Sequence, residues 1–207
     1  MTQDETLKTR KRYDRFSRFY DILESFIEGK MFRRLRKETI SDLKGNILEI
    51  GVGTGKNLQY YPKSVRLTAI DLSQGMLKKA KQKAGKLGSN IRLMQMDAEN
   101  LRFKDKSFDY IVATFVLCSI PNPIKALKEM KRVTKKDGQM IFIDHVLSKN
   151  KLIASWQHIH NPITRRIFGF NVNRDTRSNI QKAGLKIIQD EKLALFDIFR
   201  RFHVKIP

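Results

Sequence analysis

Short apolar runs alternate with segments of helical periodicity between residues 46 and 146. The apolar runs are Asn46–Ile50, Val65–Ile70, Ile91–Met96, Phe108–Val116 and Gln139–Val146, the last entered through a turn at Asp137-Gly138. The helical segments between them are Lys56–Tyr61, Gln74–Leu87 and Pro123–Thr134. Because strands that alternate with helices of this length form βαβ units, the pattern predicts a parallel sheet in an α/β domain.

The pattern changes toward the end of the chain. Arg177–Ala183 has helical periodicity and is followed by Gly184, a residue that favours a helix end. Two strand-like runs, Leu185–Gln189 and Phe196–Lys205, come next. They predict a hairpin that closes one edge of the sheet.

The first 44 residues contain an aromatic stripe at helical spacing, with arginines among its members. The stripe consists of Tyr13, Phe16, Tyr20, Leu23 and Ile27, widened by Phe19 and Phe26. It predicts a basic amphipathic helix, which either packs on the domain as a lid or lies in a membrane interface. Both hold if the lid opens toward a bilayer. We therefore divide one compact domain into a lid or membrane-contact segment, residues 1–44, and an α/β body, residues 45–207.

Length and composition narrow the class of protein. The chain has 207 residues, 41% of them hydrophobic, which fits one folded domain with a sizeable core. The longest apolar run, Tyr110–Ile120, is shorter than the ~20 residues of a membrane-spanning helix, and Met1–Arg12 lacks the apolar region of a secretory signal. Cys118 is the only cysteine, which excludes an intrachain disulfide. We therefore expect a cytoplasmic protein.

The formal net charge of +21 favours an anionic partner: nucleic acid, an anionic membrane surface or an acidic substrate. The positive charge is spread along the whole chain rather than gathered in a tail. A lysine-rich composition that only maintains solubility explains it equally well, so charge alone does not choose among these partners.

A glycine-rich turn between the first predicted strand and helix carries the main chemical signal. Its glycines are Gly51, Gly53 and Gly55. A tight turn with a ligand against the backbone leaves no room for Cβ atoms, so glycine is required there. Asp71, at the end of the second strand, can accept hydrogen bonds from both hydroxyls of a ribose, and Asp97, at the end of the third, can meet an adenine edge.

The turn differs from a dinucleotide site in two ways. Lys56 fills the place of the third glycine, and Glu49 lies just before the turn, where it would repel a pyrophosphate. Glu49 is instead suited to the cationic amino group of a methionine-like ligand. Ribose, adenine and amino acid together match S-adenosylmethionine.

These residues resemble the class I methyltransferases, from about Tyr13 to Lys205. Glu49–Gly55 is similar to the first family motif, Ala69–Met76 to the second, Met96–Glu99 to the third and Phe108–Ser119 to the fourth. The turn Thr134–Gly138 departs from the family pattern and keeps only its last glycine.

The resemblance implies a Rossmann-like sheet of seven strands with helices on both faces and the last strand antiparallel. It implies S-adenosylmethionine as the cofactor and S-adenosylhomocysteine as the product. The glycine loop and Glu49 would hold the methionine part, Asp71 the ribose, and Asp97 with Ala98 the adenine. Further contacts would come from Leu72, Met76, Thr114 and Leu117.

Within that class, Arg12–Asp21 resembles the N-terminal segment of quinone-pathway C-methyltransferases and of bacterial phosphatidylethanolamine N-methyltransferases, which implies that Tyr13 and Tyr20 cover the cofactor. Three later segments resemble small membrane-associated methyltransferases of lipids or alkyl thiols; they are Val116–Ile120, Asp144–Val146 and Trp156–His158. The tyrosine-rich tail of a quinone enzyme is not visible. Phosphatidylethanolamine is therefore the first choice of acceptor, with a quinone ring carbon or a small thiol as alternatives.

An amine, thiol or carbon acceptor has to lose a proton, a task that suits histidine. His145 follows the fifth strand and is the leading candidate, and His158 is the second, although a lone histidine is more often structural. Cys118 is more simply a buried structural residue, and the sequence shows no His/Cys spacing typical of a metal site, so we expect none.

Two other classes of function are open to this composition. An RNA methyltransferase would use the positive charge. However, Leu117–Pro121 lacks the Asn/Asp-Pro-Pro-aromatic motif of many base-amine methyltransferases, so nucleic acid is not the expected partner. A non-enzymatic cofactor sensor is disfavoured by the intact motifs. We expect a peripheral enzyme on the inner face of the membrane, with contact through the N-terminal helix and Arg165–Phe168.

Overall fold

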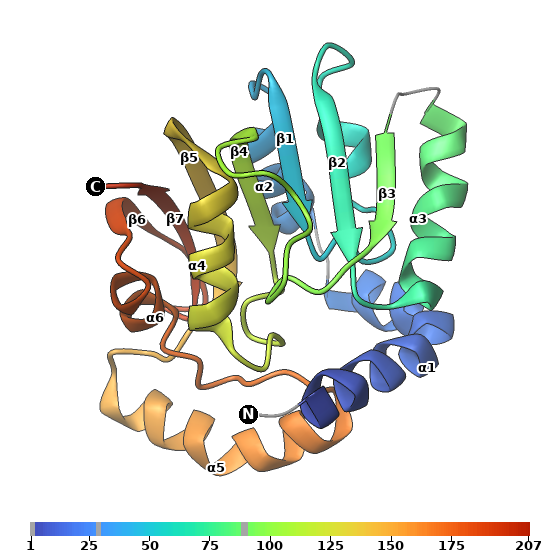
Figure 1. Ribbon diagram of the computed structural model, residues 1–207. Helices are drawn as coiled ribbons and strands as arrows, with labels where there is room; N and C mark the ends of the chain where they lie inside the picture. The colour runs from blue at the N-terminus through green and yellow to red at the C-terminus, as the bar shows by residue number, and fades with distance from the viewer. Residues whose placement is uncertain (1–2, 28–29, 88–90) are drawn as a thin grey trace.

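The computed structural model describes residues 3–27, 30–87 and 91–207, apart from the side chains of residues 3, 16, 18–27 and 30. Seven strands form one sheet in the order β3-β2-β1-β4-β5-β7-β6 (Figure 1). The strands are β1 (Asn46–Ile50), β2 (Arg66–Asp71), β3 (Ile91–Gln95), β4 (Phe108–Thr114), β5 (Thr134–His145), β6 (Lys186–Ala194) and β7 (Phe199–Lys205). Strands β1 to β5 are parallel, and β7 is antiparallel to both of its neighbours. The expected α/β architecture is confirmed.

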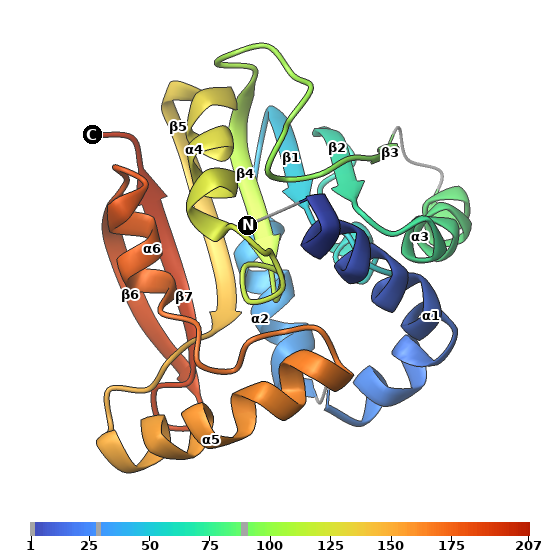
Figure 2. The same cartoon turned by 60° about the horizontal axis from the view of Figure 1, so that its bottom comes forward.

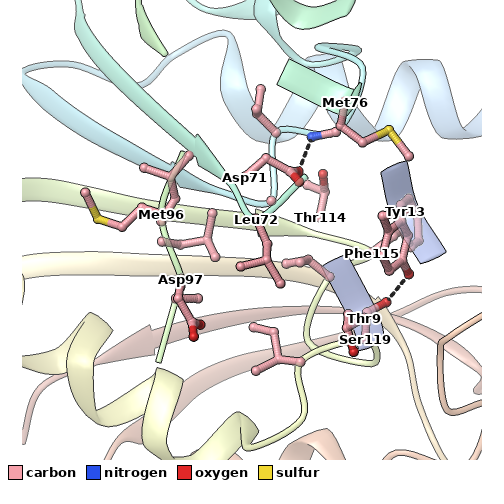
Figure 3. Close-up of a pocket in the computed structure, with 18 of the residues that line it drawn as sticks. Thr9, Tyr13, Asp71, Leu72, Met76, Met96, Asp97, Thr114, Phe115 and Ser119 are labelled. Atoms are coloured by element: carbon pink, nitrogen blue, oxygen red, sulfur yellow. Dashed lines mark hydrogen bonds between the residues drawn. The ribbon is translucent and has the colours of Figure 1, made fainter. Parts of the chain in front are cut away.

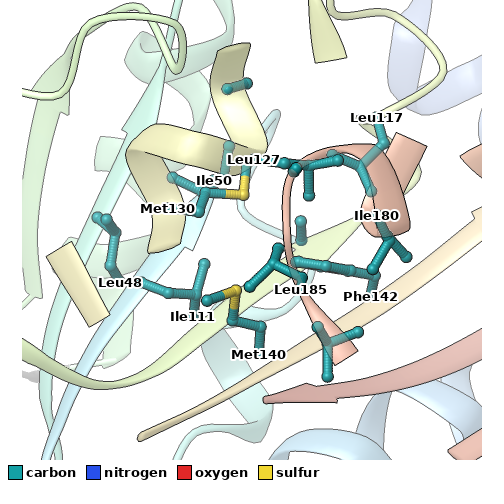
Figure 4. Close-up of a cluster of buried hydrophobic side chains, with 14 of the residues drawn as sticks. Leu48, Ile50, Ile111, Leu117, Leu127, Met130, Met140, Phe142, Ile180 and Leu185 are labelled. Carbon is teal, nitrogen blue, oxygen red and sulfur yellow. The ribbon is translucent and has the colours of Figure 1, made fainter. Parts of the chain in front are cut away.

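Helices cover both faces of the sheet, as expected. The helices are α1 (Gln3–Ile27), α2 (Lys30–Ile40), α3 (Gln74–Leu87), α4 (Pro123–Val133), α5 (Lys151–Ile167) and α6 (Thr176–Lys182), with a short 3-10 helix, η1 (Leu58–Tyr60). Two apolar clusters separate the layers. Leu48 and Ile111 pack with α4 and α6 on one face (Figure 4), whereas Ile47 and Val112 pack with α2 and α3 on the other. Neighbouring residues of a strand point to opposite faces, so both faces of these strands are apolar.

Local sequence explains where the helices begin. Asn122 precedes α4 and accepts a hydrogen bond from the backbone N–H of Lys125, while Pro123 occupies the first turn. Asn150 caps α5 in the same way through Leu152. Such caps satisfy N–H groups that have no partner within the helix.

Three predicted elements differ from the observed ones. Residues 56–61 form only a 3-10 turn, and β5 already begins at Thr134, passing through the predicted turn with an irregular register. Strand β6 continues beyond Gln189, because cross-strand ion pairs extend the ladder. These pairs join Asp190 to Arg200 and Glu191 to Arg201.

Helices α1 and α5 lie across the carboxyl ends of the parallel strands (Figures 1 and 2). The predicted N-terminal helix is therefore present, and a second helix, α2, follows it. Of the predicted stripe, Tyr13 is described, whereas the side chains of Phe16, Tyr20, Leu23 and Ile27 lie outside the described part. Within the described chain, none of the helices combines the length and apolar content that a membrane crossing requires.

Candidate cofactor site

A pocket opens at the carboxyl ends of β1, β2 and β4, beneath α1 (Figure 3). Its walls come from the glycine loop, the strand ends, the segment after β4 and the lid helix. The lining residues that the sequence singled out are Tyr13, Gly51, Gly53, Asp71, Leu72, Met76, Asp97, Ala98 and Thr114. The crevice beyond the carboxyl ends of parallel strands is where open α/β sheets bind their ligands.

The glycine loop is shaped by backbone conformations that favour glycine. Gly51 has φ +68°, and a Cβ there would lie 2.4 Å from the Val116 side chain. Gly53 has φ +54° and nothing within 4 Å of its Cβ position, so it leaves open space at the pocket wall. Gly55 does not line the pocket and instead meets Leu58 and Ala80. The first two glycines shape the binding surface, and the third allows helix packing.

Asp71 holds the loop from the end of β2. Its carboxylate accepts hydrogen bonds from the backbone N–H groups of Gly53 at 2.8 Å and Ser73 at 2.9 Å. Burial raises the pKa of Asp71 to about 6, despite these two bonds. The side chain lines the pocket, in the position expected for a group that receives a ribose.

Asp97 and its neighbours form the opposite wall. The carboxylate of Asp97 accepts a hydrogen bond from the backbone N–H of Glu99 at 2.9 Å, and Ala98 and Met96 line the pocket beside it. Leu117, however, is 1% exposed and packs in the main core rather than in the pocket wall (Figure 4). Its side chain therefore does not form part of the pocket wall, and the expected contact of Leu117 with the cofactor stays a prediction.

Glu49 lies behind the glycine loop in a buried polar network. Asn57 donates to Glu49 at 2.7 Å and to Thr114 at 3.0 Å, and Arg36 of α2 donates to both Asn57 and Thr114 at 2.9 Å. Burial raises the pKa of Glu49 to about 7. Its Oε2 atom has no hydrogen-bond partner among the described residues. The Tyr61 side chain interacts with the same carboxyl group and partly offsets the rise in its pKa. Glu49 does not line the pocket itself and lies behind its wall.

The sequence did not indicate Arg36 or Asn57. Arg36 lines the pocket from a helix that was not predicted separately, and its guanidinium also lies 5.1 Å from the centre of the Phe115 ring. Asn57 follows the glycine loop directly, so its place in the sequence is the signal that could have found it.

Helix α1 covers the pocket on the side that faces away from the sheet. Thr9 and Tyr13 line it, and the Tyr13 hydroxyl is 2.6 Å from the Ser119 hydroxyl (Figure 3). Burial raises the pKa of Tyr13, which keeps the phenol neutral. The side chain of Tyr20, the second expected lid tyrosine, lies outside the described part.

The lid rests on the amino-terminal end of α3. Asp14 accepts hydrogen bonds from the Ser73 hydroxyl at 2.6 Å and from the backbone N–H of Gly75 at 3.0 Å. A Cβ on Gly75 would lie 2.5 Å from the Ser17 hydroxyl oxygen. The two helices therefore approach closely, and an acidic side chain meets the positive end of the α3 dipole.

Neither candidate histidine, as described, lines this pocket. His145 lies at the end of β5 among aromatic rings: Phe199 at 6.3 Å and Phe170 at 5.3 Å between ring centres. Phe199 in turn lies 6.0 Å from Phe115, which lines the pocket and has φ +56°. A row of aromatic rings thus connects the pocket with His145, whose Nε2 is buried and without a hydrogen-bond partner in the described chain.

His158 is exposed on α5, and its Nδ1 lies 2.9 Å from the side-chain nitrogen of Asn173. The structure therefore gives His158 no direct contact with the pocket.

Cys118, Asp144 and His145 come together, with potential ligand atoms within 4.8 Å of one another. Both carboxylate oxygens of Asp144 already accept backbone N–H groups, from Cys118 at 3.0 Å and from His145 at 2.9 Å. Burial raises the pKa of the Cys118 thiol, which disfavours the thiolate. This arrangement serves to join the ends of β4 and β5.

The polar segment that follows α5 braces the same loop. Asn171 and Arg174 both donate to the carbonyl oxygen of Cys118 at 3.1 Å, and Arg174 also reaches that of Ile120 at 2.9 Å. Arg174 is partly buried, so these carbonyl oxygens replace water that its guanidinium has lost. The segment thereby positions the loop that carries Ser119.

Comparisons with known proteins agree with this geometry. The methyltransferase domain family matches residues 48–142. A phosphatidylethanolamine N-methyltransferase of Cereibacter sphaeroides is 37% identical over 139 residues, covering 64% of this chain and 68% of the relative. A thiol S-methyltransferase of Rattus norvegicus is 34% identical and covers 84% and 78%, respectively. A demethylmenaquinone methyltransferase of Listeria welshimeri is 31% identical and covers 81% and 73%.

Solved structures share the fold. A methyltransferase from Thermotoga maritima superposes with a TM-score of 0.70 at 20% identity, over 96% of this chain and 100% of that chain.

Proposed function

We propose that this chain, which belongs to the S-adenosylmethionine-dependent methyltransferases, transfers methyl to the amine of phosphatidylethanolamine. The cofactor is S-adenosylmethionine, as in the family. The observation that carries the choice of acceptor is the 37% identity to a phosphatidylethanolamine N-methyltransferase. The row of aromatic rings beside the pocket supports it, because it offers an apolar surface next to the methyl donor.

Two residues of the pocket wall and one residue behind it fit the three parts of the cofactor. Asp71 would accept the ribose hydroxyls, Asp97 would meet the adenine, and Glu49 would pair with the cationic amino group. The presence of Asp71 and Asp97 in the pocket wall and the open space at Gly53 support this assignment. When bound, the cofactor supplies an electrophilic methyl group on a sulfonium.

The protein then has to align and deprotonate the acceptor. His145 Nε2 would accept a proton from the ammonium group of the acceptor, which would free the amine lone pair to receive the methyl group. The sulfur of the product, S-adenosylhomocysteine, would keep the electron pair of the broken C–S bond. We assign this role to His145 because its Nε2 has no hydrogen-bond partner among the described residues. His145 does not itself line the pocket, and the rings of Phe199 and Phe115 lie between the two. Alignment of the reacting atoms supplies much of the rate.

Two other acceptors have specific support. The thiol S-methyltransferase covers more of this chain, and the demethylmenaquinone methyltransferase shares 31% identity. A thiol or an activated ring carbon would also lose a proton and would fit the same apolar surface. The expected membrane association, through α1 and residues 165–168, belongs to the proposal for a lipid acceptor.

The test is transfer of labelled methyl from S-adenosylmethionine to four acceptors offered separately. These are phosphatidylethanolamine in neutral detergent micelles, demethylmenaquinone, a small alkyl thiol and bulk RNA. Micelles present the lipid without requiring a membrane surface. Label in the phospholipid, absent with Asp71→Asn, would support the proposal. Label in thiol, quinone or RNA alone would overturn the choice of acceptor.

A further inference from the structure

Helix α5 presents an apolar stripe to solvent. Its members are Leu152 (82% exposed), Trp156 (55%), Ile159 (71%), Ile163 (56%) and Ile167 (50%). They recur every three or four residues, so they share one face of the helix. The opposite face holds the helix in place, because buried Gln157 donates to the backbone carbonyls of Val146 and Val172. Figure 2 shows α5 at the margin of the molecule.

A basic groove adjoins this stripe between α1 and α5. It is lined by Arg12, Arg15, Ile163, Arg166 and Ile167. In the described part of the chain, the three arginines form no ion pair, whereas the neighbouring Arg165 pairs with Glu5 at 3.0 Å. The three guanidinium groups can bind the oxygens of an anionic group such as a phosphate, and the two isoleucines beside them provide an apolar surface.

The tip of the β6–β7 hairpin extends the same surface. Leu195 and Phe196 are 61% and 83% exposed, and both have positive φ, +45° and +63°. Asp197 fixes the tip beside the start of α5, through hydrogen bonds from the Ser148 hydroxyl at 2.5 Å and the Lys149 backbone N–H at 2.7 Å. Strained backbone that exposes an aromatic ring is typical of functional surfaces.

We infer that α5, the arginine groove and the hairpin tip form a docking surface for an anionic phospholipid bilayer. The guanidinium groups bind the phosphodiester of an acidic lipid such as phosphatidylglycerol, and the stripe lies at the boundary of the acyl chains. An amphipathic helix with flanking arginines has this mode of binding. The inference deepens the proposed function, because it places the enzyme on the surface that carries its acceptor.

The charge of the chain decides among occupants of this surface. A second copy would bring the same three arginines and a net charge of +21 against the first. A nucleic acid would satisfy the arginines and leave the stripe in water. An anionic bilayer satisfies both the arginines and the apolar stripe.

Trp156 provides a direct test, because it is the only tryptophan in the chain and lies on the stripe. Its fluorescence is recorded while vesicles of phosphatidylglycerol and phosphatidylcholine are added. We expect a blue shift, together with quenching by lipids brominated near the headgroup end of the acyl chain. Unchanged emission in the presence of bound vesicles would overturn the inference.

Two matched pairs of variants locate the contact. Arg12→Gln/Arg15→Gln/Arg166→Gln should weaken vesicle binding on the order of 100-fold, because each basic residue at an anionic surface contributes a factor of roughly five. The control, Lys63→Gln/Lys104→Gln/Lys182→Gln, removes the same charge from exposed lysines that precede strands at the opposite edge of the sheet. Equal loss in both variants would overturn the specific groove.

The apolar contact is tested by Ile159→Asn against Ile188→Asn, since Ile188 is 48% exposed on β6. Only Ile159→Asn should weaken binding. Sedimentation of the protein without lipid measures its oligomeric state, and a dimer would contradict the inference. Co-sedimentation with vesicles in the presence of RNA measures competition. RNA that displaces the vesicles and needs the same arginines would also contradict the inference. Vesicle binding without methyl transfer in micelles would leave the docking surface intact and reject the acceptor, so the two failures are distinguishable.

Discussion

Glu49 is a buried carboxyl group behind the cofactor pocket, and Asp71 is a partly buried one that lines it; burial raises the pKa of both. Such groups favour the protonated form in the folded chain. At a pH between the pKa of the unfolded chain and the pKa of the folded chain, the carboxyl group is ionised in the unfolded chain and still protonated in the folded one. The free energy of unfolding then falls as the pH rises through that window, and it is highest below it.

For Glu49 the window extends from 4.5 to about 7. Glu49→Gln keeps the shape of the side chain without a titrating proton. As the pH rises through this window, we expect the free energy of unfolding of the variant to fall by about 3 kcal/mol less than that of the wild type. Urea unfolding of the cofactor-free protein at several pH values measures the difference. Parallel pH profiles for the two proteins would mean that Glu49 is already ionised.

Asp71→Asn should weaken the affinity for S-adenosylmethionine by about 100-fold, because a charged acceptor of hydrogen bonds is replaced by a neutral one. Isothermal titration calorimetry measures the dissociation constant. Asp137→Ala, at an exposed position in β5, is the matched control. Unchanged affinity in Asp71→Asn would reject its role toward the ribose.

His145→Asn should lower kcat by about 100-fold or more while leaving the affinity for the cofactor unchanged. The variant has no base, so solvent must deprotonate the acceptor. Its rate should then rise about tenfold per pH unit in the alkaline range, more steeply than that of the wild type. A merely structural His145 would lower the rate without steepening the pH profile.

The site residues at the ends of strands could be predicted from the sequence. The site residues that come from distant elements could not. Asp71 and Asp97 could be placed because parallel strands bring their carboxyl ends to one edge. Arg36 reaches the pocket from α2 and contacts Asn57 and Thr114, which are distant in the sequence. Such a contact has no local sequence signal. Leu117 was expected beside the cofactor, and its side chain packs in the core, since tertiary packing after β4 is not visible in the local sequence.

At the scale of elements, the packing of α1 against α3 controls the lid. Asp14 and Ser17 of α1 meet the first turn of α3 at Gly75, where no side chain fits. Helix α3 itself was predicted with its observed bounds, since its apolar periodicity is local. The extent of β6 was not, because its polar residues are held by cross-strand arginines.

Gly75→Ala should displace α1 from α3 and destabilise the protein by about 1–3 kcal/mol, because the new Cβ would overlap Ser17. Gly85→Ala in the same helix is the control: its Cβ position is open, and alanine there should stabilise by up to about 1 kcal/mol. Hydrogen exchange across residues 9–17 should accelerate only in Gly75→Ala. Similar exchange in both variants would contradict the proposed seat of the lid.

At the scale of the whole molecule, the chain has 42 basic residues and 21 acidic ones. Mutual repulsion among these charges opposes the compact state, and salt screens it. We therefore expect the unfolding temperature to rise by about 2–4 °C as sodium chloride is raised from low to physiological concentration, which corresponds to roughly 1 kcal/mol.

Differential scanning calorimetry measures this shift, and potassium chloride should act like sodium chloride. A fall in the unfolding temperature with salt would show that the ion pairs, such as those of β6 and β7, outweigh the repulsion.

Helix α1 contacts two parts of the protein at once. Tyr13 and Thr9 roof the pocket, while Glu5 pairs with Arg165 and the Arg12 side chain packs beside Gly169 at the end of α5. Any opening wide enough to exchange S-adenosylhomocysteine for fresh cofactor has to move this helix and disturb its contacts with α5. Because α5 belongs to the surface that we propose to dock on a bilayer, we expect docking there to change the rate of product release.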